Sequence, residues 1–426
     1  MKGIQLTLTA QAALAIGRQN SGGSIREVES YIPGSAIRGT IAAQILNLSG
    51  RGHQDLSKNG GEFQALFLGG RPAIFHNAYP AIARITETKA QSCTEPIYCL
   101  PATAVSSKTE PGFKMEGKDR GGVFDTVIDR ACAERCNHFY DPSCPKDGGR
   151  VEPISGFYSR SDRYDLTHRH RSHSISTRFL TRVGINRRRA TAQDSLLYST
   201  EVLNESFVPD TQATYSKWEY NAYRSQVWID DDGMADALKN YLDRHSDTFR
   251  IGGGASRGLG KVQLKTDWIP PKNGLLQRIE DFNQAFRDRW KLWSVFGGGE
   301  LGDRVFFTID LQADAIFTEQ WQRTMVLSAN LLKGYAHVQD DSLKLETAYS
   351  SYDYRGGWNS AWGLMKDIEL LTNKGSVYLF STNQPELWTE ALQRLECLGV
   401  GDRTCEGYGQ ILVCDELHQI FRENAV

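Results

Sequence analysis

Two glycine-rich segments with the same surroundings restrict what this chain can fold into. Residues 249–264 (FRIGGGASRGLGKVQL) and 398–413 (LGVGDRTCEGYGQILV) each run from a predicted helix end through a Gly-x-Gly into a predicted strand. The two Gly-x-Gly triplets, 258–260 and 407–409, are 149 residues apart (407 − 258). Each segment closes the order strand, helix, strands, helix, strand, which is that of a ferredoxin-like (RRM-like) unit. The sequence therefore predicts an α+β protein of two tandem ferredoxin-like units with antiparallel sheets, and an unrelated pair of glycine turns is the alternative.

The hydrophobic pattern gives the predicted division of the 426 residues. An alternating strand opens the chain at Ile4, Leu6 and Leu8, and Ser35 is placed to cap a helix that ends at Gly50. The predicted parts are a first unit (1–265), with an insertion at about 50–160 and an arginine-rich hairpin at about 160–200, a linker helix (266–300) and a second unit (301–426). The insertion is irregular and rich in Gly, Pro and Cys, so we expect it to decorate the scaffold rather than form core. The aromatic stripe of the linker helix is expected to be domain-packing core rather than a base-stacking surface.

Charge is concentrated in one segment. The net charge of the chain is −2, but residues 160–189 hold nine arginines and two aspartates, a local net charge of +7, together with three histidines. A solvated loop is the simpler explanation of a charge run, but this density favours a polyanionic partner such as nucleic acid. No segment has the length and apolarity of a membrane span, and MKGIQLTL is not a signal peptide, so a cytoplasmic location and reduced cysteines are expected.

The glycine loops do not match the common nucleotide-binding motifs. In both, the order is helix, glycines, strand, whereas the Walker and dinucleotide motifs require a helix after the glycines. Glycines still let backbone amides approach a phosphate closely. Since Arg257 and Lys261 flank Gly252-Gly253-Gly254, the first loop suits a polynucleotide backbone. The second loop has Asp402 and Glu406 with only Arg403, so we expect it to face protein or to contact RNA much less; a plain tight turn is the alternative for either loop.

The cysteines of the insertion suggest a structural zinc ion. Cys132, Cys136 and Cys144 are close in sequence, and thiolates suit tetrahedral zinc. The fourth ligand would be Cys99, with Cys93 or His138 as alternatives. Ordinary free thiols are the competing interpretation.

Histidines in the arginine-rich segment open an enzymatic alternative. His168, His170 or His173 could deprotonate a ribose 2′-hydroxyl in a metal-independent ribonuclease, because an imidazole pKa near 6.5 suits that step. No partner acid is evident, so an RNA-binding role without catalysis is preferred. A purely structural assembly subunit is a further alternative.

Several motifs together resemble the RAMP superfamily of CRISPR-associated RNA-binding proteins. They are YIPGSAIRGTIA (31–42), GVFDTVIDR (122–130), TRVGINRRRATAQDSLLYSTEV (181–202), the loop at 252–260 and GYG at 407–409. RGGWNSAWGL (355–364) and KGSVYLFS (374–381) are similar to the second unit of the two-unit type III-D subunit. The resemblance implies a non-catalytic subunit of a type III-D effector that holds the 5′ handle of the guide RNA. Its implied neighbours are the large polymerase-like subunit and the backbone RAMP subunits, with target RNA met indirectly.

The resemblance and the charge pattern together give the expected RNA-binding residues. By position, Tyr31, Ser35 and Arg38 would meet the RNA backbone where the first strand and helix join. The other expected contacts are Arg169, Arg171, Arg178, Arg182, Arg187, Arg188 and Arg189 of the arginine-rich segment, and Gly252, Gly253, Gly254, Arg257 and Lys261 of the first glycine loop. These residues should position RNA rather than read its sequence, because phosphate contacts carry little sequence information.

Overall fold

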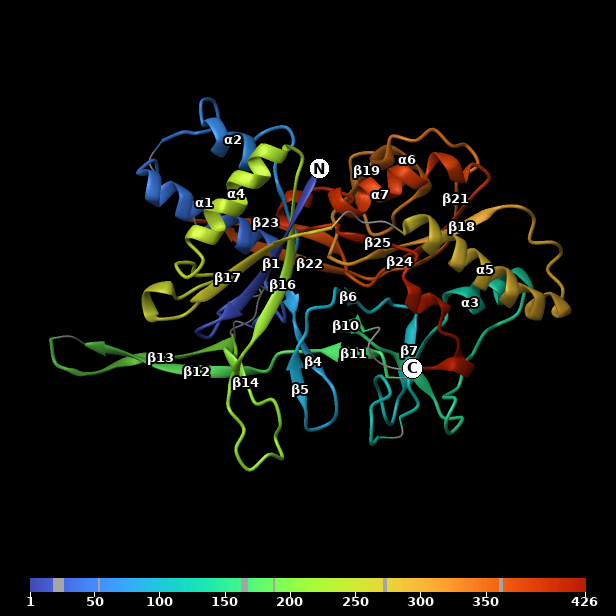
Figure 1. The fold of residues 1–426 in the computed structure, drawn as a ribbon, viewed down its shortest axis with the longest axis horizontal. Coiled ribbons are helices and arrows are strands. Elements are labelled where there is room, and N and C mark those ends of the chain that lie inside the picture. The colour runs from blue at the N-terminus through green and yellow to red at the C-terminus, as the bar shows by residue number, and fades with distance from the viewer. Residues whose placement is uncertain are drawn as a thin grey trace.

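The computed structural model describes residues 1–17, 27–52, 54–118, 120–161, 168–186, 188–270, 274–359 and 363–426, with backbone alone at 192–196 and 358–359. Two sheets of the same topology dominate it (Figure 1). The first unit contains β1 (Lys2–Ala10), α1 (Gly34–Ser49), β2 (Ile74–Phe75), β3 (Tyr79–Pro80), β16 (Ala222–Ile229), α4 (Asp232–Arg244) and β17 (Val262–Trp268). Its antiparallel sheet has the order β17-β1-β16-β2, with β3 also paired to β16.

The second unit repeats this arrangement. It contains β18 (Val305–Leu311), α6 (Ala329–Ala336), β21 (Lys344–Tyr349), β24 (Val377–Thr382), α7 (Thr389–Leu398) and β25 (Ile411–Val413). The antiparallel order β21-β24-β18-β25 matches that of the first unit strand for strand. The predicted α+β fold of two tandem ferredoxin-like units is therefore confirmed.

Local sequence explains most of these elements. On β1, Ile4, Leu6 and Leu8 are fully buried, as their alternation predicts. Helix α1 ends at Gly50, which has a left-handed backbone, φ 65°. The predicted cap at Ser35 is wrong, because the helix begins one residue earlier at Gly34. The side chain of Asn77, between β2 and β3, accepts the Gly34 N–H at 2.8 Å and so takes the place of a local cap.

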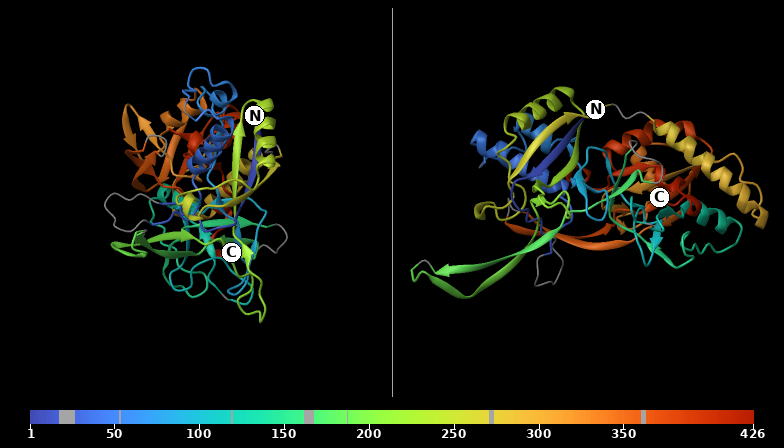
Figure 2. Two further views of the ribbon diagram at one scale, coloured as in Figure 1. Left: turned by 90° about the vertical axis from the view of Figure 1, so that its left-hand side faces the viewer. Right: turned by 60° about the horizontal axis from the view of Figure 1, so that its bottom comes forward.

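A long hairpin is inserted before the third strand of each sheet. In the first unit it is β12 (Thr177–Asn186) with β13 (Thr191–Leu203), and Figures 1 and 2 show it projecting from the body of the molecule. In the second unit it is β22 (Tyr352–Asn359) with β23 (Leu364–Thr372). Smaller hairpins are β14 (Ser206–Phe207) with β15 (Glu219–Tyr220), and β19 (Phe317–Glu319) with β20 (Gln322–Thr324).

The insertion builds more core than the sequence suggested. It comprises helices α2 (Gly61–Phe67) and α3 (Val127–Arg135) and two small sheets. The first sheet contains β4 (Ile82–Arg84), β5 (Ala90–Ser92), β6 (Ile97–Cys99), β10 (Phe157–Arg160) and β11 (His170–His173). The second contains β7 (Ala104–Ser107), β8 (Val123–Asp125) and β9 (Val151–Pro153). Phe113 and Phe124 are buried in one cluster with Leu417 and Ile420 from the C-terminal segment. The expectation of a coreless insertion is wrong because apolar residues of the C-terminal segment, far away in the sequence, complete its core.

The linker helix belongs to the core of the second unit. Helix α5 (Leu275–Trp293) buries Ile279, Phe282 and Phe286, and the Phe286 ring stacks on Phe306 of β18 at 4.4 Å between centroids. The aromatic stripe is thus packing core, as predicted. Among the described residues, no helix has the length and apolarity needed to cross a membrane.

Candidate functional site

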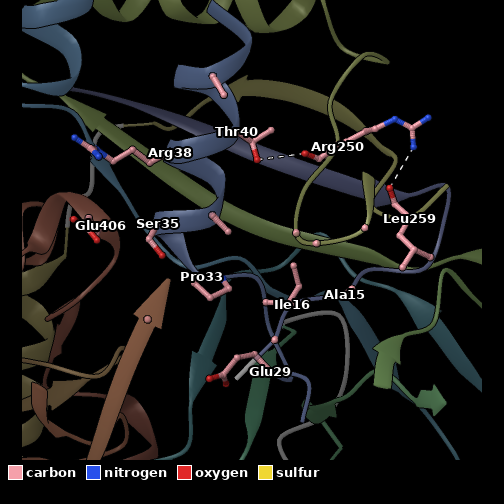
Figure 3. Close-up of a pocket in the computed structure, with 18 of the residues that line it drawn as sticks. Ala15, Ile16, Glu29, Pro33, Ser35, Arg38, Thr40, Arg250, Leu259 and Glu406 are labelled. Atoms are coloured by element: carbon pink, nitrogen blue, oxygen red, sulfur yellow. Dashed lines mark hydrogen bonds between the residues drawn. The ribbon is translucent and has the colours of Figure 1, made fainter. Parts of the chain in front are cut away.

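A groove of about 1380 Å³ lies where the two units meet (Figure 3). Its middle is formed by α1. One end is formed by the first glycine loop and hairpin β12–β13, and the other by the second glycine loop and hairpin β22–β23. We call these the first end and the second end. In Figure 3, Arg250 and Leu259 lie on one side of α1 and Glu406 lies on the other.

The two glycine loops have the same backbone conformation. Each contains one turn of 3-10 helix, η1 (Ala255–Arg257) and η4 (Thr404–Glu406), at the 149-residue offset seen in the sequence. Left-handed residues fall at the same four positions, Gly252 and Gly401, Gly254 and Arg403, Gly258 and Gly407, and Gly260 and Gly409. Matching hydrogen bonds of 2.8 Å join Ile251 N–H to the Gly260 carbonyl and Val400 N–H to the Gly409 carbonyl. The loops are therefore a structural repeat and not an unrelated pair of turns.

Arginines at the first end bind neutral groups. Arg257 donates to the Tyr198 hydroxyl at 2.8 Å and lies over that ring, and Arg182 donates to the Arg257 carbonyl at 3.3 Å. Arg250 donates to the Leu259 carbonyl at 3.2 Å. Within the described parts of the chain, none of these three arginines has a carboxylate partner. Their positive charge is therefore available to a ligand in the groove.

The cations that the second glycine loop and hairpin β22–β23 bring to the second end are paired with carboxylates. Glu406 accepts from Arg403 at 2.6 Å and from Lys366 at 3.3 Å, both at Oε2. Burial acts to raise the pKa of Glu406, but these two cations outweigh it and hold the pKa below its usual value. Arg355 lies 2.9 Å from Asp314 and 3.5 Å from Glu29. The charges of this end therefore largely cancel.

At the groove the backbones of the two units lie so close together that no side chain fits between them. A Cβ atom on Gly34 would lie 2.0 Å from the Phe75 carbonyl oxygen and 2.9 Å from the Cα of Gly407. Nearby, the buried Tyr79 hydroxyl donates to the Gln312 carbonyl across the same boundary. The second glycine loop thus contacts protein, as expected, and the protein is the first unit of the same chain.

Most of the predicted phosphate-binding residues line this groove. They are Tyr31, Ser35, Arg38, Arg182, Gly252, Gly253, Gly254 and Arg257. Tyr31 is only 2% exposed, so it cannot stack on a base. The guanidinium of Arg38 is bound to the Phe67 carbonyl at 2.5 Å.

Other predicted RNA contacts lie elsewhere. Arg188 and Arg189 are exposed near the turn of hairpin β12–β13, and Arg178 pairs with Glu205 at its base. Arg171 is buried on β11 and Arg169 precedes that strand. Lys261 is exposed but does not line the groove, and Arg187 lies outside the described residues.

The three histidines do not share one environment. Burial lowers the pKa of His170 to about 3, with Arg169 and Arg160 adding to the effect, and burial lowers that of His173 to about 4. His173 bonds to the Ser159 hydroxyl at 2.8 Å. His168, which precedes β11, lines a small pocket of about 40 Å³ beside Arg84 and outside the groove, and the buried His170 forms part of its wall. His170 and His173 are thus neutral core residues.

The cysteines of the insertion do not converge. Cys136 lies 3.3 Å from the Gly297 carbonyl, and Cys99 donates to the Gln312 carbonyl at 3.0 Å. The His138 ring packs on Phe296. Cys93, Cys132 and Cys144 are also buried and reduced. In the described ranges, no three His, Cys, Asp or Glu side chains are grouped closely enough to hold a metal. This arrangement does not fit the expected tetrahedral site, and zinc stays a prediction.

Sequence reasoning missed four groove cations. Arg250, Arg355 and Lys366 were not singled out, and Arg403 was noted only as part of an acidic loop. Arg250 directly precedes the first glycine cluster, so its position was a usable signal. The hairpin β22–β23 could have been found by carrying the first unit's hairpin onto the second.

Fold and groove together define a protein of two tandem ferredoxin-like units with a groove between them that charged side chains line. The family model of the RAMP superfamily matches residues 26–263, more than half of the chain. The chain therefore belongs to the RAMP superfamily, as its motifs indicated. No curated protein matches the sequence significantly.

Solved structures show only distant likenesses. A chain of the type III-B Cmr-beta complex bound to cognate target RNA and AMPPnP is 10% identical, with 91% of this chain and 93% of that chain covered and a TM-score of 0.39. Oligomeric Cmr4 from Pyrococcus furiosus is 12% identical, with 63% of this chain and 100% of that chain covered and a TM-score of 0.27. Because these TM-scores are low, the family assignment depends on the sequence match.

Proposed function

We propose that this protein is a non-catalytic RNA-binding subunit of a type III CRISPR effector and that its groove holds the guide RNA. The observation that carries the proposal is the first end of the groove. There, none of Arg182, Arg250 and Arg257 forms an ion pair with a carboxylate of the described chain. Such guanidiniums provide several N–H donors each for phosphate oxygens. Membership of the RAMP superfamily supports RNA as the polyanion.

The finer assignment is to subtype III-D, with the 5′ handle of the guide in this groove. It is supported by the motifs of the second unit, RGGWNSAWGL and KGSVYLFS, which resemble the two-unit subunit of that subtype. The large polymerase-like subunit and the backbone RAMP subunits are the neighbours that follow from this assignment. Crosslinking within the assembled complex would test it, since the groove residues must contact handle nucleotides rather than the spacer.

Binding of a labelled guide RNA to the purified chain tests the core of the proposal. Arg182→Ala and Arg257→Ala should each weaken binding about fivefold to tenfold, the effect of losing one charged hydrogen bond. Arg71→Ala is the matched control, because Arg71 is an exposed arginine outside the groove that pairs with Asp230. Equal effects of all three substitutions would show that the groove is not the RNA site.

A metal-independent ribonuclease remains the alternative function, and His168 is its one candidate outside the core. The substrate would have to reach the small pocket that this residue shares with Arg84 and Lys114. Incubating the chain with repeat RNA in a chelator should leave the RNA intact. A discrete cut that disappears in His168→Ala would replace the binding-only function.

A further inference from the structure

The repeated loops carry opposite charges at the same place. The 149-residue offset that aligns the loops also aligns Arg257 with Glu406, each being the last residue of its 3-10 turn. Each residue contacts the long hairpin of its own unit, Arg257 through Tyr198 on β13 and Glu406 through Lys366 on β23. The backbone is thus duplicated, while the charge that reaches the groove is reversed.

This reversal determines where a phosphate can lie. At the first end a phosphodiester meets guanidiniums that hold only neutral partners in the described structure. At the second end it meets the carboxylate of Glu406, which already binds Arg403 and Lys366, and the carboxylates of Asp314 and Asp367 also line this end. Placing a second anion there brings like charges together, which is unfavourable in a partly buried groove.

The second end offers contacts that suit bases instead. Met365 lines it and is 71% exposed, which offers an apolar surface for the flat face of a base. Tyr408 lines it as well, under the guanidinium of Arg403 at 5.2 Å. Glu406 uses only Oε2 for its two cations, and no described residue is bonded to Oε1. That oxygen can accept a hydrogen bond from the N–H edge of a base.

We propose that the groove binds single-stranded RNA in one orientation, with backbone phosphates at the first end and bases against Met365, Tyr408 and Glu406 at the second. This inference depends on the proposed RNA-binding function and adds which part of the strand, phosphates or bases, faces each end of the groove. The second glycine loop is then a base-contacting copy of the phosphate-binding one.

Salt dependence distinguishes the two ends. The purified full-length chain is titrated with a short uridine homopolymer over a range of salt concentrations, and log Kd is plotted against log salt. Arg182→Gln and Arg257→Gln should each reduce the slope by about 0.7, the value for one phosphate on a single strand. Lys366→Gln, the matched substitution at the second end, should leave the slope unchanged. Thermal unfolding of each variant confirms that it is folded.

An abasic strand of the same length tests the base contacts. Met365→Ala should weaken binding of the uridine strand severalfold, the effect of losing a base-packing surface, and leave binding of the abasic strand unchanged. A slope lowered as much by Lys366→Gln as by Arg257→Gln would overturn the orientation. So would a Met365→Ala effect that is equal for both strands. If the unaltered chain binds neither strand, the RNA-binding function itself fails.

Discussion

The first and second ends of the groove have the same backbone arrangement. Both place a glycine loop beside a long hairpin, and the left-handed positions of the two loops coincide. They differ in what position 257 or 406 presents to the groove, an arginine in one and a glutamate in the other. Backbone geometry in this repeat is set by where glycine is required, whereas ligand preference is set by a single charged side chain.

The largest effect is expected where the shared backbone is blocked. Gly409 has φ 66°, and a Cβ there would lie 1.8 Å from the Val400 carbonyl oxygen. Gly409→Ala should therefore lower the free energy of unfolding by at least about 3 kcal/mol, from left-handed strain and steric overlap. Gly260→Ala, with 2.5 Å to the Ile251 oxygen, should cost about as much or slightly less.

Gly258→Ala is the control for strain without overlap. This glycine also has a positive φ, 85°, but a Cβ there meets nothing within 4 Å. Its cost should be about 1 kcal/mol, measured by urea denaturation of all three variants. Similar costs for Gly258→Ala and Gly409→Ala would mean that the loop can relax around the added carbon.

Giving the first end the charge of the second should lower the free energy of unfolding less than the glycine substitutions do, but it should weaken RNA binding strongly. Arg257→Glu places a carboxylate where a phosphate is proposed to lie, and guide RNA binding should weaken by about 2 kcal/mol, roughly 30-fold. Arg71→Glu makes the same charge change outside the groove and should alter binding only slightly. The comparison of the two Kd values at one salt concentration removes the effect of net charge.

The repeat could be predicted from the sequence because the spacing of its glycines is visible there directly. The prediction failed at Ser35 because the helix start is set by Asn77, a residue between β2 and β3 that is far from it in the sequence. Arg355 could not be assigned for the same reason, since Glu29 and Asp314 are far from it in the sequence. Periodicity and local motifs predict elements and loops, but the partners of a charge depend on contacts that only the folded chain makes.

A buried ion cluster distinguishes the second unit from the first in its response to pH. The Gly260 N–H bonds to the Ala13 carbonyl in the first unit, and the Gly409 N–H bonds to the Asp314 carbonyl in the second. Since these residues correspond, Thr9 of β1 corresponds to Asp310 of β18, so the second unit carries a charge where the first has a hydroxyl. Asp310 lies 2.8 Å from His418, and Asp125 of the insertion lies 3.2 Å from the other ring nitrogen. Burial alone would lower the pKa of His418, but these two carboxylates outweigh it and raise the pKa well above its usual value.

Since the folded pKa is raised, the protonated His418 contributes stability that is complete below about pH 6.5, the unfolded value. That stability is lost as the pH rises toward the folded pKa, at up to about 1.4 kcal/mol per pH unit. Urea denaturation from neutral to mildly alkaline pH should show this slope, and His418→Gln should be less stable near pH 7 and lack that part of the slope. An identical slope in His418→Gln would show that other groups cause the pH dependence.

The smallest effect should come from removing the second end's carboxylate. Glu406→Gln releases Arg403 and Lys366 from their shared partner, so phosphates can approach an end from which they were excluded. RNA affinity should rise about threefold, and the salt slope should steepen by up to about 0.7. Asp367→Asn is the matched control, because Asp367 also lines the groove and has no ion-pair partner among the described residues. It removes the same charge without releasing a cation, so its salt slope should stay unchanged. A steeper slope in both variants would show that the groove responds only to its total charge, and the distinction between its two ends would then be lost.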